Sequence, residues 1–227
     1  MADILQKLKS MELFKDYDER SLIELSQGLE FVRLDADTTL FEAGQPANFC
    51  YIISYGGIKM VKPSPKGRDV VMCFLHAGDI VAAGIMSNNP PIYPLTAVTQ
   101  EDSGLIKIPR REYTEIWQNK PQLMRAVNQS LMSRMVDFQT DKALFLSSVP
   151  QKVASFLIRT LDHQPHSYGQ TINLRLTRKD IADRVGTSGE TVIRILSEWT
   201  QKGWITTTDQ HISILDRQAV ENILTER

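Results

Sequence analysis

The chain has 227 residues, with 26 Lys and Arg against 27 Asp and Glu and a formal net charge of -1. It therefore lacks the bulk basic charge of many nucleic-acid-binding proteins, and it is long enough for two modest domains. Its two cysteines, Cys50 and Cys73, are too few for a disulfide framework or a metal cluster motif. Because no apolar run reaches the ~18 residues of a membrane span and the first residues lack a signal-peptide core, we expect a cytoplasmic protein without a membrane partner.

The first half of the chain indicates short helices followed by many short strands. Residues 4–29 favour helices whose apolar positions suit a lid. Apolar runs at residues 31–34, 39–41, 49–54, 58–61, 70–75 and 104–108 predict strands. Turns are indicated at Gly44, Gly56-Gly57, Pro65–Gly67 and Gly78-Asp79. This spacing predicts a small antiparallel barrel or roll.

A long helix is predicted from Arg111 to Phe145, with a break near Pro121. Apolar residues recur every seven positions in it, which is the coiled-coil period, and two more lie beside them. This set comprises Met124, Leu131, Phe138 and Phe145, with Val127 and Met135. The helix either packs on its own domain or pairs with its twin, and we expect pairing.

The last third begins after a predicted hinge at Ser147–Pro150. A helix is expected over 151–161, a polar loop over 162–169 and, from its alternation, a strand over 171–176 with Ile172, Leu174 and Leu176 inward. Two short runs on either side of Asp209, 204–208 and 210–214, predict a β-hairpin wing.

Two helices joined by a tight turn are predicted between residues 176 and 203. Thr177 with Asp180 resembles a capping box, Gly186 ends the first helix, and Thr187 or Ser188 caps the second. Apolar residues then recur at i, i+3, i+4 and i+7, and form one buried stripe: Val192, Ile195, Leu196 and Trp199. A strand, two helices and a wing together predict a winged helix-turn-helix.

The opposite face of the second helix has side chains suited to contact DNA bases. It carries Gly189, Glu190, Ile193, Arg194 and Ser197. Arg can donate two hydrogen bonds to guanine and Glu can accept one from cytosine. Glu190 and Arg194 lie four residues apart, so a simple surface ion pair is the open alternative. Phosphate contacts are expected from a few placed groups: Arg178, Lys179, Thr187, Ser188 and Lys202.

The string LTRKDIADRVGTSGETVIRIL resembles the helix-turn-helix of the Crp/Fnr family (cyclic-AMP receptor protein and fumarate–nitrate reduction regulator). In that family a Ser-Arg-Glu-Thr-Val-x-Arg run opens the recognition helix, and here Ser188 to Arg194 matches it with Gly189 in place of the first Arg. The resemblance assigns base-contacting roles to Glu190 and Arg194. One guanine contact, that of the missing Arg, is expected to be lost.

The resemblance extends more weakly over nearly the whole chain and implies an α+β architecture. An antiparallel β-roll of the cyclic-nucleotide-binding, jelly-roll type is expected over 1–120, a central dimerisation helix and hinge over 121–148, and the winged helix-turn-helix over 149–227. It implies a homodimeric transcription regulator that binds an inverted repeat in double-stranded DNA, with RNA polymerase as a partner.

The cyclic-nucleotide site of the family is not reproduced in the sequence. Ala82-Ala83-Gly84 follow Gly78-Asp79-Ile80-Val81 where the family has Gly-Glu-Leu, and Tyr93-Pro94 stand in place of Arg-Ser. The ribose and phosphate ligands are therefore gone, which argues against cyclic AMP unless Lys59 or Arg68 substitutes in another geometry. The remaining effector pocket is expected to be apolar and to suit an uncharged small molecule or none. Its lining is predicted as Ile80, Ala82, Ala83, Gly84, Ile85, Met86, Tyr93, Pro94, Leu95 and Thr96.

Other cofactors of the family find little support. No cysteine precedes Cys50, which argues against an iron–sulfur cluster, and His76 is a weak candidate for a haem ligand. His163 and His166 could touch a metal, and a Cys50–Cys73 redox switch is open, although both thiols lie in apolar patterns.

Two other classes of function compete with the regulator. A cupin-like metalloenzyme is disfavoured because His76 is the only histidine in the predicted roll and no catalytic motif occurs. A sensor or binding module with a degenerate helix-turn-helix, acting through protein contacts, remains the alternative, since Gly189 and the neutral charge favour it.

Overall fold

The computed structural model describes residues 2–64, 69–164 and 169–225, so the predicted turn at Pro65–Gly67, Arg68 and His166 lie outside the described residues. The fold separates into two compact units, Met1–Pro63 with Cys73–Met135, and Ser64–Met72 with Val136–Arg227. Each unit is described by itself. Among the described helices, none combines the length and the apolar character that crossing a bilayer requires.

The first unit opens with three short helical segments, as the sequence predicts. They are α1 (Ala2–Lys9), the 3-10 turn η1 (Glu12–Phe14) and α2 (Glu19–Ser26). Helix α2 begins where the Asp18 side chain accepts a hydrogen bond from the Ser21 amide at 2.7 Å. Leu8, Phe14 and Leu25 are buried in the core of this unit, so the segments are an integral layer of it.

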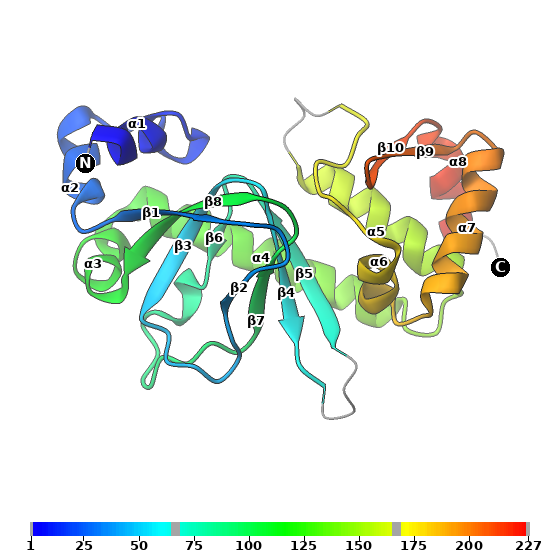
Figure 1. The fold of residues 1–227 in the computed structure, drawn as a ribbon, viewed down its shortest axis with the longest axis horizontal. Helices are drawn as coiled ribbons and strands as arrows, with labels where there is room; N and C mark the ends of the chain where they lie inside the picture. Colours follow the sequence, from blue (N-terminus) through cyan, green and yellow to red (C-terminus); the bar gives the residue numbers. More distant parts are fainter. Residues whose placement is uncertain (1, 65–68, 165–168, 226–227) are drawn as a thin grey trace. The chain divides into compact units, whose positions relative to one another are not determined.

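In the part of the first 109 residues that the structure describes, eight strands form two four-stranded antiparallel sheets (Figure 1). The first sheet has the order β1-β8-β3-β6 and the second β2-β7-β4-β5. Their bounds are β1 Glu30–Leu34, β2 Thr39–Phe41, β3 Phe49–Tyr55, β4 Gly57–Lys62, β5 Val70–His76, β6 Ile80–Val81, β7 Thr96–Thr99 and β8 Ser103–Pro109. Apart from β4 and β5, neighbouring strands are not consecutive in sequence, which is typical of a jelly roll.

All six predicted strands are confirmed, and two were missed. Strand β6 has only two residues, and β7 is a polar alternation, TAVT, that does not stand out from a loop. A 3-10 turn, η2 (Ala83–Ile85), and a cis Asn89-Pro90 bond lie between them. The missed strands therefore border the segment that the sequence assigns to the effector pocket.

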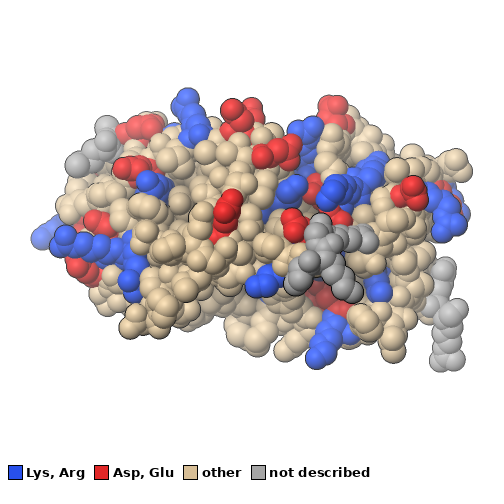
Figure 2. Space-filling model, turned by 60° about the horizontal axis from the view of Figure 1, so that its bottom comes forward, with Lys and Arg blue, Asp and Glu red and all other residues tan. Residues whose placement is uncertain are grey.

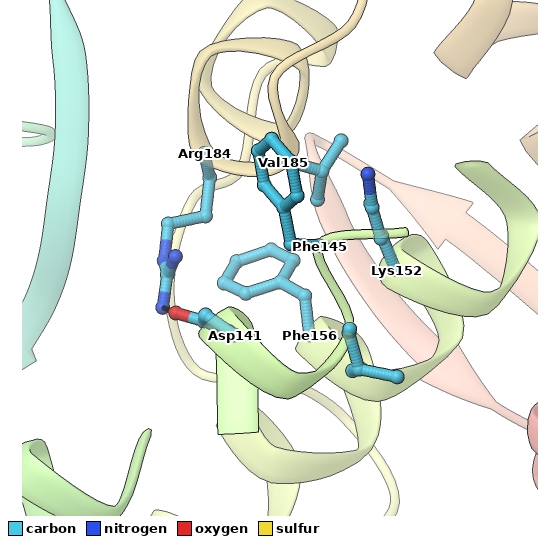
Figure 3. Close-up of a pocket in the computed structure, with 7 residues that line it drawn as sticks. Asp141, Phe145, Lys152, Phe156, Arg184 and Val185 are labelled. Atoms are coloured by element: carbon cyan, nitrogen blue, oxygen red, sulfur yellow. Dashed lines mark hydrogen bonds and ion pairs between the residues drawn. The ribbon is translucent and has the colours of Figure 1, made fainter. Parts of the chain in front are cut away.

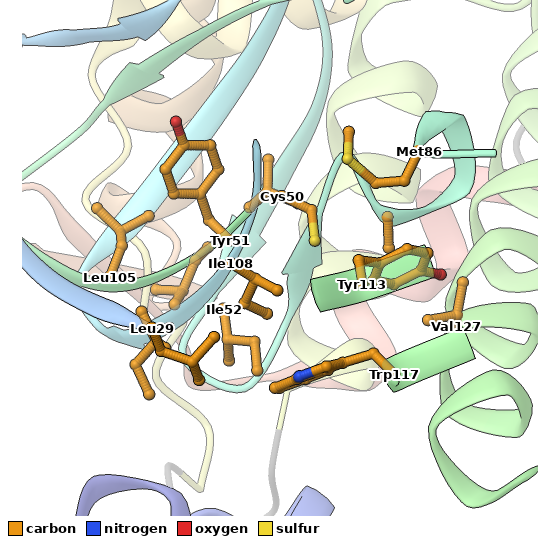
Figure 4. Close-up of a cluster of buried hydrophobic side chains, with 14 of the residues drawn as sticks. Leu29, Cys50, Tyr51, Ile52, Met86, Leu105, Ile108, Tyr113, Trp117 and Val127 are labelled. Atoms are coloured by element: carbon orange, nitrogen blue, oxygen red, sulfur yellow. The ribbon is translucent and has the colours of Figure 1, made fainter. Parts of the chain in front are cut away.

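The roll encloses a continuous apolar core, which Figure 4 shows at its helical end. The inward residues of β3 and β8, such as Ile52 and Ile108, meet Trp117 and Tyr113 from the segments that follow the roll. The indole of Trp117 donates a hydrogen bond to the Leu25 carbonyl at 3.3 Å, which ties α2 to this end of the core. Burial raises the pKa of Tyr113 to about 12, so its phenol stays neutral.

The predicted long helix is present and broken as expected. It consists of α3 (Arg110–Glu115), the 3-10 turn η3 (Trp117–Asn119) and α4 (Pro121–Ala143). Proline at the first position of α4 explains the break, because it lacks the amide that would continue the preceding helix. Helix α4 ends at Ala143, so Phe145 lies beyond the helix rather than on it.

After the end of α4, the described part of the second unit holds four helices and a hairpin (Figure 1). They are α5 (Val149–His163), α6 (Arg178–Val185), α7 (Gly189–Gln201), β9 (Ile205–Thr208), β10 (His211–Ile214) and α8 (Arg217–Asn222), followed by the 3-10 turn η5 (Ile223–Thr225). Helix α5 begins two residues before the predicted 151, because Ser148 and Gln151 form a capping box and Pro150 fits the first turn. Val149 and Pro150 are thus helical, not part of an extended hinge.

The strand predicted over 171–176 is wrong. Only Thr171 forms a bridge, with Ser213, and the rest of the segment is irregular. The alternation in the sequence still reflects burial, since Ile172, Leu174 and Leu176 are all buried. The segment is held to the hairpin by two backbone hydrogen bonds, from Ile172 N to the Ile212 carbonyl of β10 and from Leu176 N to the Gln210 carbonyl in the turn before β10.

Candidate functional site

Helices α6 and α7 are joined by a turn whose geometry is set locally. The Thr177 and Asp180 side chains form the expected capping box at the start of α6. Gly186 ends α6 in the left-handed conformation at φ 76°, where a side chain would be strained. Ser188 caps α7, and its hydroxyl accepts from the Thr191 amide at 3.2 Å. Of the two predicted caps, Ser188 is therefore correct and Thr187 precedes it.

Helix α7 presents two chemically different faces. One face is buried within the second unit, as predicted, and consists of Val192, Ile195, Leu196 and Trp199. Glu190, Ile193, Arg194 and Ser197 are exposed, and Gly189 is half-buried. The residues assigned to base contacts are therefore brought together on one solvent-facing stripe.

Glu190 and Arg194 do not form the surface ion pair that their spacing allows. Within the described part of the chain, neither side chain has a hydrogen-bond or ion-pair partner. Helices α6 and α7 do form such pairs elsewhere, between Lys179 and Asp183 and, at 2.6 Å, between Lys202 and Glu198. The two groups on the predicted base-contacting face thus keep their full hydrogen-bonding capacity for a ligand.

The residues assigned to phosphate contacts surround this face but differ in availability. Lys179 and Lys202 are paired with the carboxylates named above, and Lys202 also lies 4.5 Å from the Trp204 ring. Arg178 is half-buried beside Thr207 of the hairpin, and burial lowers the pKa of its guanidinium. Ser188 is exposed at the N-terminus of α7, where free amides and the helix dipole favour an anion.

The predicted wing is present as an antiparallel hairpin of β9 and β10, in register from Ile205–Ile214 to Thr208–His211. Asp209 and Gln210 both have positive φ, 48° and 67°, as a two-residue hairpin turn requires. Leu215 N and Asp216 N donate to the Trp204 carbonyl, which anchors the base of the hairpin next to α7.

The residues assigned to the effector pocket divide between core and surface. Ala83, Met86 and Tyr93 are buried in the core of the roll, and Gly84 and Pro94 are exposed. Ile80, Ala82, Ile85, Leu95 and Thr96 are half-buried. Ala82 adopts a left-handed conformation at φ 64°, which turns the chain from β6 into η2.

Tyr93 occupies the interior of the roll with its whole side chain. Its ring stacks on Phe41 with centroids 3.8 Å apart, and its hydroxyl donates to the Phe49 carbonyl at 2.6 Å. Burial raises the pKa of this phenol. An apolar stack therefore stands where the family resemblance would place a cation for a phosphate.

Helix α4 exposes an apolar surface that only partly coincides with the set predicted from the sequence. Its exposed large apolar residues, which we call the α4 stripe, are Leu131, Met132, Met135, Val136 and Phe138. Of the other predicted members, Val127 is buried and Met124 packs against the core of the roll, while Phe145 is 74% exposed beyond the end of the helix. The sequence missed Met132 and Val136 because they lie outside a strict heptad.

Acidic residues at the end of α4 form an ion-pair cluster with α5 and α6. Asp141 accepts from both Arg159 and Arg184, and Asp137 accepts from Arg159 at 2.9 Å. A pocket of about 100 Å³ adjoins Asp141 and Arg184, with Phe145, Lys152 and Phe156 in its wall (Figure 3). The sequence did not predict this ion-pair cluster, because the arginine partners of Asp137 and Asp141 are distant in sequence.

The two cysteines and the described histidines form no common ligand group. Cys50 is fully buried, which raises the pKa of its thiol, and His76 lies 3.5 Å from Asp79. Among the described residues, no group of three or more potential ligands is arranged to hold a metal ion. On the face shown in Figure 2, basic and acidic side chains are interspersed.

Two family models match this chain. The Crp-like helix-turn-helix domain covers residues 151–223 and the cyclic nucleotide-binding domain covers residues 31–120. The CRP-like cAMP-activated global transcriptional regulator of Mycobacterium tuberculosis is 23% identical over 210 residues, 91% of this chain and 93% of the relative. The transcriptional activator protein anr of Pseudomonas aeruginosa is 26% identical over 182 residues, 78% and 73% of the two chains.

The solved structure of FixK2 from Bradyrhizobium japonicum has the same fold, with a TM-score of 0.73 at 22% identity over 86% of this chain and 96% of that one. The roll with its unbroken cyclic nucleotide-binding match, the capped α6–α7 pair and the hairpin that follows α7 thus occur together in one chain. The chain belongs to the Crp/Fnr family of DNA-binding transcription regulators.

Proposed function

We propose that the protein acts as a homodimer that binds an inverted repeat in double-stranded DNA, and that cyclic AMP does not control it. The observation that carries the proposal is the exposed face of α7, on which Glu190 and Arg194 have no partner among the described residues. Charged groups that form no contact within the protein are available to bases in a major groove, where α-helices fit.

The base contacts follow from the chemistry of these side chains. Arg194 donates to O6 and N7 of a guanine, and Glu190 accepts from N4 of a cytosine. Ser188, Thr187, Arg178, Lys179 and Lys202 contact phosphates around them, with the two lysines exchanging their intramolecular carboxylates for phosphate. Two such helices in a dimer enter successive major grooves about 34 Å apart.

The α4 stripe supports the homodimer. It places five large apolar side chains on the exposed surface of one helix, a patch that favours association with another protein. A second copy presents the same stripe, so a two-fold axis along α4 buries both at once. In this proposal residues 1–120 sense, 121–148 dimerise and 149–227 bind DNA.

The filled interior of the roll supports independence from cyclic AMP. The Tyr93 ring stacks on Phe41 and its hydroxyl is satisfied by the Phe49 carbonyl. An anionic phosphate without a paired cation is costly to bury, and Tyr93 offers none. Any effector is therefore an uncharged small molecule, held by the half-buried residues among those assigned to the effector pocket.

The cellular location, the contact with RNA polymerase and the lack of catalysis are proposed from membership of the family. A bacterial-type regulator of this kind acts in the cytoplasm, contacts RNA polymerase at its target promoters and has no catalytic activity of its own. The charge of -1 is compatible with DNA binding because the contacts are few and specifically placed.

Selection of the purified full-length protein against a pool of random duplex DNA, without small molecules, tests the proposal. An inverted repeat with centres about one helical turn apart is expected. Arg194→Ala should abolish enrichment of one G·C pair and weaken binding by roughly tenfold or more per half-site. Arg111→Ala, which removes an exposed arginine of helix α3, is the matched control and should change nothing.

The alternative function is a sensor module with a degenerate helix-turn-helix that acts through protein contacts. Gly189, which removes one base-contacting side chain, and the paired state of Lys179 and Lys202 favour it. Failure to enrich any sequence, with or without cell extract, would support this alternative and refute DNA recognition.

A further inference from the structure

We infer that the pocket beside the end of α4 is a binding site for a small aromatic carboxylate. The pocket belongs entirely to the second unit and has a volume of about 100 Å³. It is separate from the effector pocket assigned to the roll. The second unit would recognise such a ligand by itself, whether or not DNA is bound, so the site is additional to the proposed function.

The body of the pocket is apolar and has two phenyl rings in its wall (Figure 3). Phe156 comes from α5, Val185 from the last residue of α6, and Leu144 and Phe145 from the turn that follows α4. Phe156 is buried, whereas Phe145 is 74% exposed. A ligand ring placed against both phenyl rings would remove part of Phe145 from water, and aromatic rings pack favourably on one another.

The size of the pocket limits the ligand to about one small ring. An apolar cavity of ~150 Å³ holds benzene. The volume of about 100 Å³ is somewhat less, but Phe145 lies in a turn and faces solvent, so its ring can move outward as the ligand enters. Larger ring systems would have to displace Phe156, which is part of the core of the second unit.

The charged groups of the wall favour an anion. Lys152 forms no ion pair with the described residues, and its ammonium lies 5.8 Å from the centre of the Phe145 ring. The Asp141 carboxylate accepts from both Arg159 and Arg184, so its negative charge is offset. An anionic group of the ligand therefore meets Lys152 without an uncompensated carboxylate beside it.

A carboxylate fits these groups better than a phosphate. Phosphate groups are typically bound by the two parallel donors of an arginine, and the Arg184 guanidinium is engaged by Asp141. Lys152 offers a single positive charge, which matches the single negative charge of a carboxylate. The ring in the apolar body and the carboxylate at Lys152 together define the class of ligand.

A ligand in this position contacts three elements at once. They are the turn after α4, helix α5 and helix α6, which is the first helix of the helix-turn-helix. The pocket exists only when the three are packed together, so the bound ligand should stabilise the folded second unit by mass action.

A titration of the full-length protein with benzoate, followed by saturation-transfer NMR, tests the inference. For a ligand of this size we expect a dissociation constant on the order of 1 mM. Benzamide, which has the same shape without the charge, should bind about fivefold to tenfold more weakly, because it lacks the charged contact with Lys152.

The protein variants assign the two parts of the site. Lys152→Met should weaken benzoate about fivefold to tenfold and leave benzamide unchanged, and Lys152→Arg should restore most of the loss. Phe145→Ala should weaken both ligands about fivefold, since it removes one of the two rings. Lys142→Met, which removes an exposed lysine of α4 outside the pocket wall, is the matched control and should change neither affinity.

Three results would overturn the inference. The wild type could show no saturable benzoate binding up to about 20 mM, well above the expected dissociation constant. Benzamide could bind as tightly as benzoate, which would remove the requirement for an anion. Lys142→Met could weaken benzoate as much as Lys152→Met does, which would mean general attraction to a basic surface and not a site. The lysine and Phe145 variants alter partly or fully exposed side chains, so each should fold as the wild type does.

Discussion

Asp141 is the residue whose loss should most disturb the link between the end of α4 and the helix-turn-helix. Its carboxylate accepts hydrogen bonds from Arg159 of α5 and, through the other oxygen, from Arg184 of α6. In Asp141→Ala both contacts disappear. Arg159 keeps Asp137 at 2.9 Å, whereas Arg184 forms no other ion pair with the described residues and keeps only its contact with the Phe156 ring, 5.8 Å away.

The magnitude follows from burial. The Arg184 side chain is 12% exposed and the Asp141 side chain 27%, so the pair is mostly shielded from water. Removal of one partner from a fully buried pair costs about 3–5 kcal/mol, and an exposed pair is worth about 0–1 kcal/mol. For this intermediate case we expect the free energy of unfolding of the second unit to fall by about 2–3 kcal/mol.

Urea denaturation followed by tryptophan fluorescence measures this loss. In a shared Trp117→Phe background the signal comes from Trp199 and Trp204, both in the second unit. Glu198→Ala, which breaks the exposed pair with Lys202, is the matched control and should cost about 0.5 kcal/mol. Arg184→Ala added to Asp141→Ala should cost little more, because the unpaired charge is then gone.

The reasoning is refuted if Asp141→Ala destabilises the second unit no more than Glu198→Ala does. It is also refuted if Asp141→Asn, which keeps the shape and one hydrogen bond but not the charge, equals the wild type. Either result would mean that α4, α5 and α6 are held by apolar packing alone.

Three further predictions concern other parts of the chain. Met135→Glu puts a charge in the α4 stripe and should turn a dimer into a monomer in analytical ultracentrifugation, whereas Gln122→Glu on the first turn of α4 should not. Tyr93→Arg should lower the stability of the roll by about 3 kcal/mol or more, since it buries a charge. Tyr93→Phe should lower it by about 1–2 kcal/mol, because the Phe49 carbonyl loses its donor. Differential scanning calorimetry measures both losses, and a binding assay on Tyr93→Arg should show no gain in affinity for cyclic AMP. Iodoacetamide at pH 8 should label native protein at Cys73 at most, because burial both hides Cys50 and raises its pKa, and mass spectrometry of Cys73→Ser should then show no adduct.

The local features of the DNA-binding unit are predictable from sequence because short-range chemistry fixes them. The Thr177–Asp180 capping box, the left-handed Gly186 and the turn at Asp209 each depend on residues within three positions. The buried stripe of α7 follows from a 3.6-residue period. Their prediction therefore needed no tertiary information.

Features that depend on distant partners were not predictable in the same way. The alternation at 171–176 fits a strand equally well, and only the geometry next to β10 decides that a single bridge forms at Thr171. Asp141 gives no local signal, because Arg159 and Arg184 are 18 and 43 residues away. Likewise Val127 fits the heptad, yet the core of the roll buries it.

The side chains of the roll and those on the exposed face of α7 differ in whether they contribute to packing. In the roll, Ala83 and Tyr93, to which the sequence resemblance assigns the family's nucleotide-binding positions, are buried in the core. The ring of Tyr93 fills space there and the Phe49 carbonyl accepts from its hydroxyl. On α7 the opposite holds, since Glu190 and Arg194 contribute nothing to packing and are left without partners among the described residues. Polar groups kept on an exposed face without a structural role indicate a ligand, and in a capped helix-turn-helix that ligand is DNA.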